Sequence, residues 1–326
     1  MKTVNLLPED GAFYKANLHC HTVRSDGKWT PEQVKKEYQQ RGYSVVAFTD
    51  HRHYEWHSQL TDETFVPVAA YEADLNEPFP AVGGFQRVRT YHLNFYDTEP
   101  EKREAFTALQ PPQRYGDMPA LNAFIREMND RGFLCCYNHP YWSLQCYDDY
   151  KDLEGCFAME IFNYGCELDG MYGGAPQSYD EMLRSGKKLF CVATDDNHDS
   201  YEPGDPMNDS FGGWTMLKMP VLDYAHVIGA LKDGNFYASA GPEIHEFYIK
   251  DNTLTITCSP VEKIYIVTKG RRCLMKLAPA GTNGLTEASF PLTGDEGYIR
   301  ADCRDACGRH AWTNAYFIDS LTGNES

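Results

Sequence analysis

Long apolar runs recur along the chain and alternate with segments in which apolar residues have a helical spacing. Continuous apolar runs are typical of strands in a parallel sheet that is covered on both faces. The runs of this kind are 43–49, 65–71, 133–138 and 188–194. Residues 88–95 alternate instead, as in a half-buried strand. The pattern predicts an α/β fold built around parallel strands.

The segment before the run 43–49 has the signals of a helix. Thr30 is suited to the N-cap, Pro31 to the first helical position, and Gly42 to the end of the helix. A helix between two strands of one sheet makes a right-handed crossover, which would place the strand 14–18 beside 43–49. The residues expected on the inner face of the helix are Val34, Tyr38 and Arg41. A second helix is expected over 121–131, before the run 133–138.

Histidines and carboxylates stand at the ends of the strand-like runs, where (β/α) barrels place reactive side chains. His19 and His21 follow the segment 14–18, and the alternation of side chains along an extended chain puts both rings on one side. By itself this His-x-His pair also suits a surface strand without a metal. The turn that contains Asp26 can fold a carboxylate back beside these rings. The series of histidines and carboxylates at the ends of the strand-like runs therefore predicts a metal-binding site on one rim of the sheet.

The order of these motifs resembles the polymerase and histidinol phosphatase (PHP) superfamily. The segments that carry the resemblance are 17–22 (NLHCHT), 25–27 (SDG), 48–51 (FTDH), Glu72, His92, 138–140 (NHP) and 194–198 (TDDNH). They match the family in order and approximate spacing over residues 14 to about 242. The resemblance implies a distorted (β/α)7 barrel that holds two or three divalent cations and hydrolyses phosphoesters.

The resemblance also implies a set of metal ligands, which comprises His19, His21, Asp26, His51, Glu72, His92, His139, Asp196 and His198. Glu72 matches the bridging carboxylate, which can hold two cations close together while cancelling part of their repulsion. Asp196 is preferred to Asp195 because the family pattern is Asp-x-His. Asp50 and Asp195 are expected to hold the ligands in position without binding the metal themselves. The proline after His139 is expected to hold that histidine in an extended conformation.

The types of donor atom indicate which metals could bind and which reaction they could support. Imidazole nitrogen and carboxylate oxygen suit zinc, manganese or iron(II), and the sequence does not choose among them. The implied nucleophile is a metal-bound hydroxide, which can attack phosphorus or a carbonyl carbon. The candidates for a general acid are His53 and His57.

The residues that would contact substrate are less defined by the sequence. Three arginines could bind a phosphate or be ordinary surface charges: Arg52, Arg87 and Arg89. Four residues are candidates for the pocket wall or for loop packing: Tyr141, Trp142, Asn163 and Tyr164. Cys20 should point away from the flanking histidines and fill the core.

The pattern changes near residue 243, from alternating helices and strands to short alternating strands alone. The expected strands are 246–250, 253–258, 263–268, 297–303 and 311–318. We therefore predict a metallohydrolase barrel over 1–242 and a small β-sandwich-like domain over 243–326. The passages 234–242 and 312–316 are similar, more loosely, to the carbaryl hydrolase (CehA/McbA) subgroup. That likeness implies hydrolysis of a carbamate ester as the alternative reaction.

The composition limits the classes of partner that the protein could bind. The chain has 326 residues and a formal charge of −17, without clusters of Lys and Arg, which argues against binding a long nucleic acid. A small phosphorylated metabolite or nucleotide remains compatible, because bound metals give a local positive field. Eleven cysteines, many in apolar runs, suit a reducing cytosol. The first residues lack the apolar core of a signal peptide, and no apolar run is long enough to span a membrane, so a cytoplasmic location is expected.

Two classes of function remain open from the sequence. The first is a metal-dependent phosphoesterase, favoured because every ligand position is filled. The second is a non-catalytic binding protein whose metals only stabilise the fold. Nothing in the sequence indicates the oligomeric state.

Overall fold

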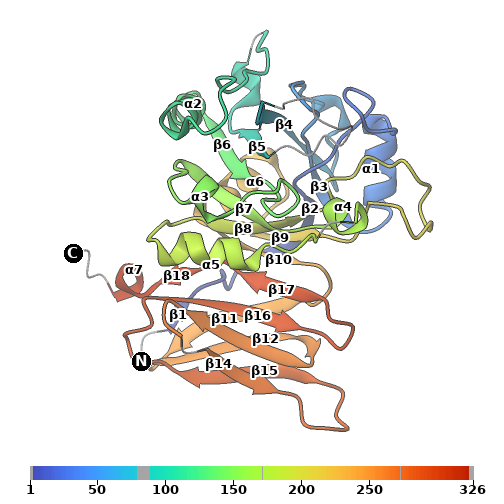
Figure 1. Cartoon of the computed structure of the whole chain (residues 1–326). Coiled ribbons are helices and arrows are strands. Elements are labelled where there is room, and N and C mark those ends of the chain that lie inside the picture. The colour runs from blue at the N-terminus through green and yellow to red at the C-terminus, as the bar shows by residue number, and fades with distance from the viewer. Residues whose placement is uncertain (1–2, 79–88, 104, 171, 272, 323–326) are drawn as a thin grey trace.

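The computed structural model describes residues 3–78, 89–103, 105–170, 172–271 and 273–322. It is a mixed α/β protein with one large mixed sheet and one small antiparallel sheet (Figure 1). The strands of the large sheet are β2 (Ala12–Asn17), β3 (Tyr43–Phe48), β4 (Val66–Asn76), β5 (Thr90–Asp97), β6 (Phe133–Tyr137), β7 (Cys156–Asn163), β8 (Phe190–Thr194), β9 (Trp214–Met219), β10 (Phe236–Ser239), β13 (Lys263–Thr268), β14 (Leu274–Leu277), β16 (Tyr298–Arg304), β17 (His310–Thr313) and β18 (Tyr316–Phe317). The small sheet contains β1 (Thr3–Asn5), β11 (Ile244–Lys250), β12 (Thr253–Val261) and β15 (Leu285–Pro291).

Helices connect the strands and lie mainly in the first two thirds of the chain (Figure 1). The α-helices are α1 (Pro31–Gln39), α2 (Met118–Asp130), α3 (Tyr147–Tyr150), α4 (Tyr164–Leu168), α5 (Pro176–Arg184), α6 (Tyr224–Asp233) and α7 (Ile318–Thr322), with short 3-10 turns at Ser58–Leu60 and Pro100–Lys102. Within the described ranges, no helix combines the length and the apolar composition needed to cross a membrane.

The predicted strand, helix, strand unit is present within the large sheet. β2, β3 and β4 are parallel neighbours, and α1 connects the first two. Thr30 caps α1 by accepting a hydrogen bond from the backbone of Gln33, whose side chain returns to the backbone of Thr30. Val34 and Tyr38 are buried as expected, but the placement of Arg41 on the inner face was wrong. Arg41 lies beyond the helix end and is exposed.

A long antiparallel hairpin interrupts the parallel order. β5 pairs antiparallel with both β4 and β6, whereas β6, β7 and β8 are parallel again. β4 continues past Glu72 to Asn76, because Ala73 and Leu75 remain buried against the apolar residues of β5. Glu72 therefore lies inside a strand, and the prediction that it ends a strand was wrong. His92 lies inside β5, as the alternating pattern of 88–95 predicted. Because β5 is antiparallel to its neighbours, its first residues lie at the same rim as the carboxyl ends of the parallel strands.

The last strand of the series β2 to β9 lies beside both the first strand and β8. β9 pairs antiparallel with β2, and it also lies against β8 at the other end of the series. The Oγ1 atom of Thr215 in β9 accepts a hydrogen bond from the amide of Ala193 in β8 at 3.2 Å and donates one to the carbonyl of the same residue at 3.0 Å. Apolar side chains from β2, β3, β4, β6, β7, β8 and β9 share one buried cluster.

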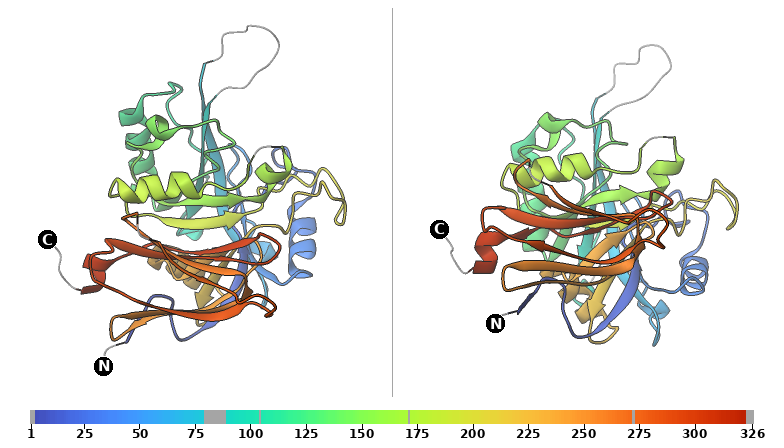
Figure 2. Two further views of the ribbon diagram at one scale, coloured as in Figure 1. Left: turned by 60° about the horizontal axis from the view of Figure 1, so that its bottom comes forward. Right: turned by 90° about the horizontal axis from the view of Figure 1, so that it is seen from below.

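The remaining strands gather at one end of the molecule, orange to red in Figures 1 and 2, with the N-terminal strand β1 among them. β10 pairs with β17, so the large sheet continues into this region, and a separate apolar core lies here. The expected strands from 246 to 303 are confirmed, while 311–318 divides into β17, β18 and the start of α7. β14 and β15 were not predicted. Most of their residues are exposed, and their apolar residues do not alternate regularly with polar ones. The boundary at residue 242 stays a prediction.

Candidate metal centre

All nine predicted ligands come together at one rim of the large sheet. They form four overlapping groups in which the candidate donor atoms lie within 4.8 Å of one another. These groups are His21, Asp26, His51 and His198; His19, Glu72 and His139; His19, His21 and Asp196; and His51, Glu72 and His92. Most follow the carboxyl ends of β2, β3, β6 and β8, and the other two lie within β4 and β5. Their role as ligands stays a prediction, and the geometry of the groups shows what they could hold.

The most compact group has the dimensions of three donors around one cation. The Nε2 atoms of His19 and His21 lie 3.1 Å apart, and Asp196 Oδ1 lies 3.0 Å from the first and 2.9 Å from the second. Donors about 2.1 Å from one ion and at right angles would be about 3.0 Å apart. His19 and His21 are fully buried, so the three polar atoms meet where water has little access. Three residues in this arrangement fit a divalent cation.

Glu72 faces two different sets of histidines with its two oxygens. Oε1 lies 3.0 Å from His92 Nδ1 and 3.4 Å from His19 Nε2. Oε2 lies 2.9 Å from His51 Nδ1 and 3.5 Å from His21 Nε2. Yet Oε2 is buried without a hydrogen bond from any described residue, so the nearby ring nitrogens are not aligned to donate to it. A carboxylate held in this way is suited to bridging two cations.

Asp26 closes the outer side of the cluster at longer distances. Its oxygens lie 3.5 Å from His198 Nε2, 3.6 Å from His21 Nδ1 and 3.7 Å from His51 Nε2. The Asp26 side chain is 55% exposed, whereas Glu72 is almost fully buried. The cluster therefore opens to solvent on the side of Asp26.

Opposite charges compensate one another within the cluster. Burial opposes charge on His51, but the carboxylates of Glu72, Asp26 and Asp196 together raise the pKa of His51 to about 9. Burial likewise opposes charge on His198, and Asp26 raises its pKa to about 9. Burial and the nearby His198 lower the pKa of His21 to about 4. Despite burial, the surrounding histidines hold the pKa of Glu72 well below its usual range. The cluster thus holds protons that a divalent cation would displace.

Asp50 supports the turn that carries Asp26. Its carboxylate accepts hydrogen bonds from the amide of Thr22 at 2.7 Å, the hydroxyl of Thr22 at 2.8 Å and the hydroxyl of Ser25 at 2.8 Å. In the same turn, a Cβ atom on Gly27 would lie 2.4 Å from the carbonyl oxygen of His21, so this position accepts only glycine. Asp50 is nearly buried and fixes the path of the chain between two candidate ligands.

Asp195 supports the loop beyond the last motif. Its carboxylate accepts hydrogen bonds from the hydroxyl of Tyr38 at 2.9 Å and from three consecutive backbone amides, 211–213, each at 2.8 Å. The same loop contains Asp209, which accepts a hydrogen bond from the amide of His198 at 2.8 Å. Asp195 therefore acts on the candidate ligands through the backbone of this loop.

Glu160 is a buried carboxylate of the site that the sequence interpretation missed. It lies in β7 and accepts hydrogen bonds from His19 Nδ1 at 2.7 Å, the hydroxyl of Thr194 at 2.7 Å, the amide of His139 at 3.0 Å and Asn163 Nδ2 at 3.0 Å. A carboxylate on Nδ1 keeps the proton on that nitrogen and leaves the Nε2 lone pair free for a metal. The signal in the sequence is a single acid inside the apolar run 156–162, where an unpaired charge would be costly.

His139 has a backbone conformation that the sequence did not predict. Its φ is +25°, so the expectation that Pro140 would hold it extended was wrong. Two hydrogen bonds outweigh the local preference: the His139 amide donates to Glu160, and the Ser143 amide donates to the His139 carbonyl at 3.1 Å. Asp196 has a φ of +54°. Conformations of this kind cost about 1–3 kcal/mol for a residue other than glycine and are common at functional sites.

The candidate general acids lie outside the four groups. His53 is exposed, and its ring lies 3.3 Å from Glu55. His57 is only 2% exposed and packs edge-on against Phe48, as a core residue does. The geometry gives neither histidine a place beside the proposed ligands.

The arginines considered for phosphate binding are engaged with carboxylates. Arg52 pairs with Asp74 through two contacts of 2.6 Å, and Arg89 pairs with Glu77 and Asp149. Arg87 lies outside the described residues.

The four candidates for the pocket wall separate in the structure. Trp142 packs against His92 and His139, with ring centroids 5.7 Å and 5.1 Å away. Asn163 Nδ2 donates to Asp196 Oδ2 at 3.0 Å, so it positions a proposed ligand. The other two lie elsewhere: Tyr141 is 53% exposed beside Tyr172, and Tyr164 packs on Gly212. Cys20 is fully buried in an apolar cluster, as expected.

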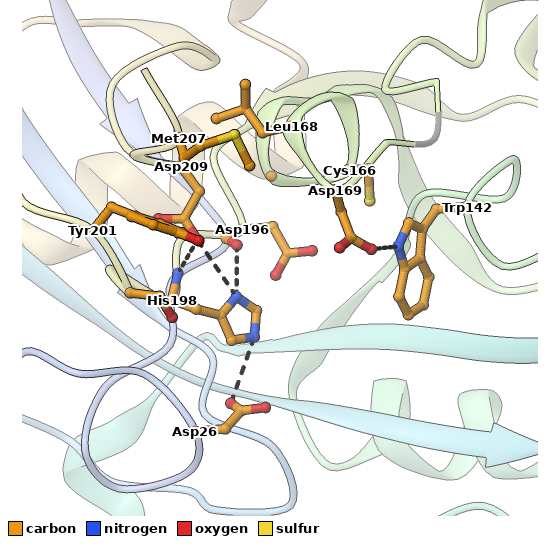
Figure 3. A pocket seen from close by; sticks show the side chains of 12 residues that line it. Asp26, Trp142, Cys166, Leu168, Asp169, Asp196, His198, Tyr201, Met207 and Asp209 are labelled. Atoms are coloured by element: carbon orange, nitrogen blue, oxygen red, sulfur yellow. Dashed lines mark hydrogen bonds and ion pairs between the residues drawn. The ribbon is translucent and has the colours of Figure 1, made fainter. Parts of the chain in front are cut away.

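A cavity of about 370 Å³ adjoins the cluster (Figure 3). Asp26, Asp196 and His198 line it on the side of the cluster. The other lining residues come from the turn after β6, from α4 and from the loop between β8 and β9, and they are Trp142, Gly165, Cys166, Leu168, Asp169, Ser200, Tyr201, Met207 and Asp209. A small molecule in this space could reach the proposed metal ions.

Comparisons with known proteins give structural likenesses only. No protein-family model and no curated protein matches the chain. Among solved structures, it is similar to a two-domain protein from Bacteroides vulgatus ATCC 8482 described as containing a predicted PHP-like metal-dependent phosphoesterase, at 15% identity and a TM-score of 0.47, covering 92% of this chain and 94% of that chain. It is also similar to a protein from Bifidobacterium adolescentis ATCC 15703 provisionally named a metal-dependent phosphoesterase, at 14% identity and a TM-score of 0.36, covering 62% of this chain and 94% of that chain.

Proposed function

We propose that this protein is a metal-dependent hydrolase that cleaves a small phosphoester. The observation that carries the proposal is the convergence of nine histidines and carboxylates beside a cavity, with donor separations near 3.0 Å in the tightest group. The order of the same residues along the chain resembles the PHP superfamily, which favours a phosphoester over other substrates. Hydrolysis of a carbamate ester is the alternative reaction.

The side chains of the site have different proposed roles. Bound divalent cations would supply an activated water and neutralise charge on the phosphoryl oxygens. Glu160 keeps the His19 proton on Nδ1, and Asn163 holds Asp196 in place. Asp26, the most exposed of the proposed ligands, faces the cavity where substrate would enter. Trp142 covers His92 and His139 and limits the access of water to them.

The finer assignments are part of the same proposal. We infer that β2 to β9 form the distorted barrel implied by the sequence, and that two or three zinc, manganese or iron ions bind at its rim. The proposed substrate is a small phosphorylated molecule, and neither a long nucleic acid nor a membrane is a proposed partner. All eleven cysteines are free, which supports a cytoplasmic location.

The test combines metal analysis with turnover. The protein is prepared with zinc, manganese or iron, its metal content is measured, and activity is assayed on p-nitrophenyl phosphate, bis-p-nitrophenyl phosphate and an aryl methylcarbamate, before and after treatment with a chelator. We expect phosphoester turnover that the chelator removes and the metal restores, in a chain that stays folded. Turnover of the carbamate alone would favour the alternative reaction. Bound metal with no turnover, and a lower melting temperature after chelation, would favour a binding protein.

A further inference from the structure

We propose that the cavity beside the metal centre receives the organic group of a monophosphate ester, and that this group is uncharged and apolar or aromatic. The inference rests on the proposed function and names its substrate class. Substrates with a second phosphate or a carboxylate on the organic group would be disfavoured.

The wall of the cavity away from the proposed ligands contains large apolar and aromatic side chains as well as two carboxylates. Trp142 stands on one side and Tyr201 and Met207 stand on the other, and Leu168 comes from the end of α4 (Figure 3). Tyr201 is 48% exposed and Met207 is 46% exposed, although both are large side chains that a folded chain tends to bury. Aromatic and thioether groups on opposite sides of a small cavity are suited to an apolar ligand.

Trp142 is held in place on two sides. Its Nε1 atom donates a hydrogen bond to Asp169 at 2.8 Å, and its ring packs nearly perpendicular to that of His139, at 82°. The indole is therefore a fixed wall that reaches from the proposed ligands to the open part of the cavity. An aromatic group attached to a phosphate at the metals could pack on it.

The charge of the cavity excludes a second anionic group. None of the described residues that line it is a lysine or an arginine, whereas Asp169 and Asp209 contribute carboxylates. Two arginines carried by the ligand loops are already paired, Arg24 with Glu55 at 2.9 Å and Arg52 with Asp74 at 2.6 Å. A second phosphate or a carboxylate would meet like charge without a cationic partner, which costs binding free energy at short range. The metals would neutralise only the phosphate that they bind.

The experiment compares two esters that differ by one charge. The ratio of kcat/KM is measured for phenyl phosphate and 4-carboxyphenyl phosphate, with the metal content of each preparation determined in parallel. We expect wild type to favour phenyl phosphate by about tenfold, the size of one unfavourable charge contact near a protein surface. The carboxylate makes the phenol a slightly better leaving group, so the chemistry alone would favour the opposite order.

A cationic substitution should remove the preference. Met207→Arg is expected to lower the ratio of phenyl to carboxyphenyl activity by about tenfold without loss of metal. Tyr201→Arg provides a second variant on the same wall, in case the first does not fold. Met275→Arg is the matched control, because Met275 is also an exposed methionine, at 48%, but lies on β14 away from the cavity.

The outcomes separate the two proposals. A wild-type preference for the carboxylated ester, or an unchanged ratio in the cationic variants, would overturn this inference and leave the proposed function standing. If the metal-loaded protein hydrolyses neither phosphate ester, the proposed function fails and the inference fails with it.

Discussion

Replacing Glu160 by glutamine tests whether a buried carboxylate sets the protonation of His19. Each Glu160 oxygen accepts two hydrogen bonds: Oε1 from His19 Nδ1 and the Thr194 hydroxyl, and Oε2 from the His139 amide and Asn163 Nδ2. A glutamine has nearly the same shape but one NH2 group. Whichever way this amide is turned, its NH2 group points at two donors.

The two orientations of the glutamine differ in their consequences. With NH2 at the Oε2 position, it faces a backbone amide that cannot change, and an asparagine whose oxygen already accepts a hydrogen bond from the amide of Cys166 at 2.9 Å. With NH2 at the Oε1 position, the Thr194 hydroxyl can rotate to accept, and His19 can move its proton to Nε2. The second orientation is therefore favoured. It converts His19 Nε2 from a free lone pair into an N–H group, which cannot bind a metal.

The expected loss follows from these contacts. Removing the hydrogen-bonded partner of a metal-binding histidine typically lowers metal affinity by about 10–100-fold. This range corresponds to about 1.4–2.7 kcal/mol of binding free energy. Hydrogen bonds to charged groups contribute about 1.5–3 kcal/mol each. A measured loss of metal-binding free energy near the lower end of the expected range would therefore mean that neighbouring groups rearrange and restore part of the lost hydrogen bonding.

The assay is a competition between the protein and a chromogenic chelator for zinc, together with the melting temperature with and without metal. Glu127→Gln is the control, since Glu127 lies on α2 with a side chain 52% exposed and should leave metal affinity unchanged. A folded Glu160→Gln variant with the affinity of wild type would refute the reasoning, because His19 would then not depend on Glu160 for its tautomer or would not bind metal.

Three further predictions use single measurements. His21→Ala or Glu72→Ala should reduce metal content and abolish hydrolysis in a chain that stays folded, and full metal occupancy by elemental analysis would count against these ligands. Because the pKa values of His51 and His198 are raised to about 9, both hold protons at neutral pH and must lose them to a metal, so metal affinity should rise with pH up to about 9. Calorimetry in two buffers of different ionisation enthalpy should detect the released protons, and equal heats would contradict the prediction. Thr30→Ala should lower the free energy of unfolding by about 1 kcal/mol in a denaturant titration, because it removes the cap of α1.

The sequence predicts the parallel units well and the hairpin poorly, for a physical reason. Residues 43–48 and 190–194 are mostly apolar and mostly buried, as in a parallel sheet that is covered on both faces. In β4, Glu72 and Asp74 interrupt the apolar pattern and look like the end of a strand. Their burial depends on partners from distant segments, histidines for the first and Arg52 for the second, and sequence periodicity does not contain those contacts.

The nine candidate ligands were predicted from the sequence through the resemblance that their order carries, but Glu160 and the local backbone were not. Strand alternation could not show that His139 and Asp196 adopt positive φ. Glu160 connects these two residues. It accepts a hydrogen bond from the His139 amide and another from Asn163, whose Nδ2 atom also donates to Asp196. One buried carboxylate, recognisable in the sequence only as an isolated acid in an apolar strand, thus stabilises two strained ligand positions and the tautomer of His19, so its loss should affect all three.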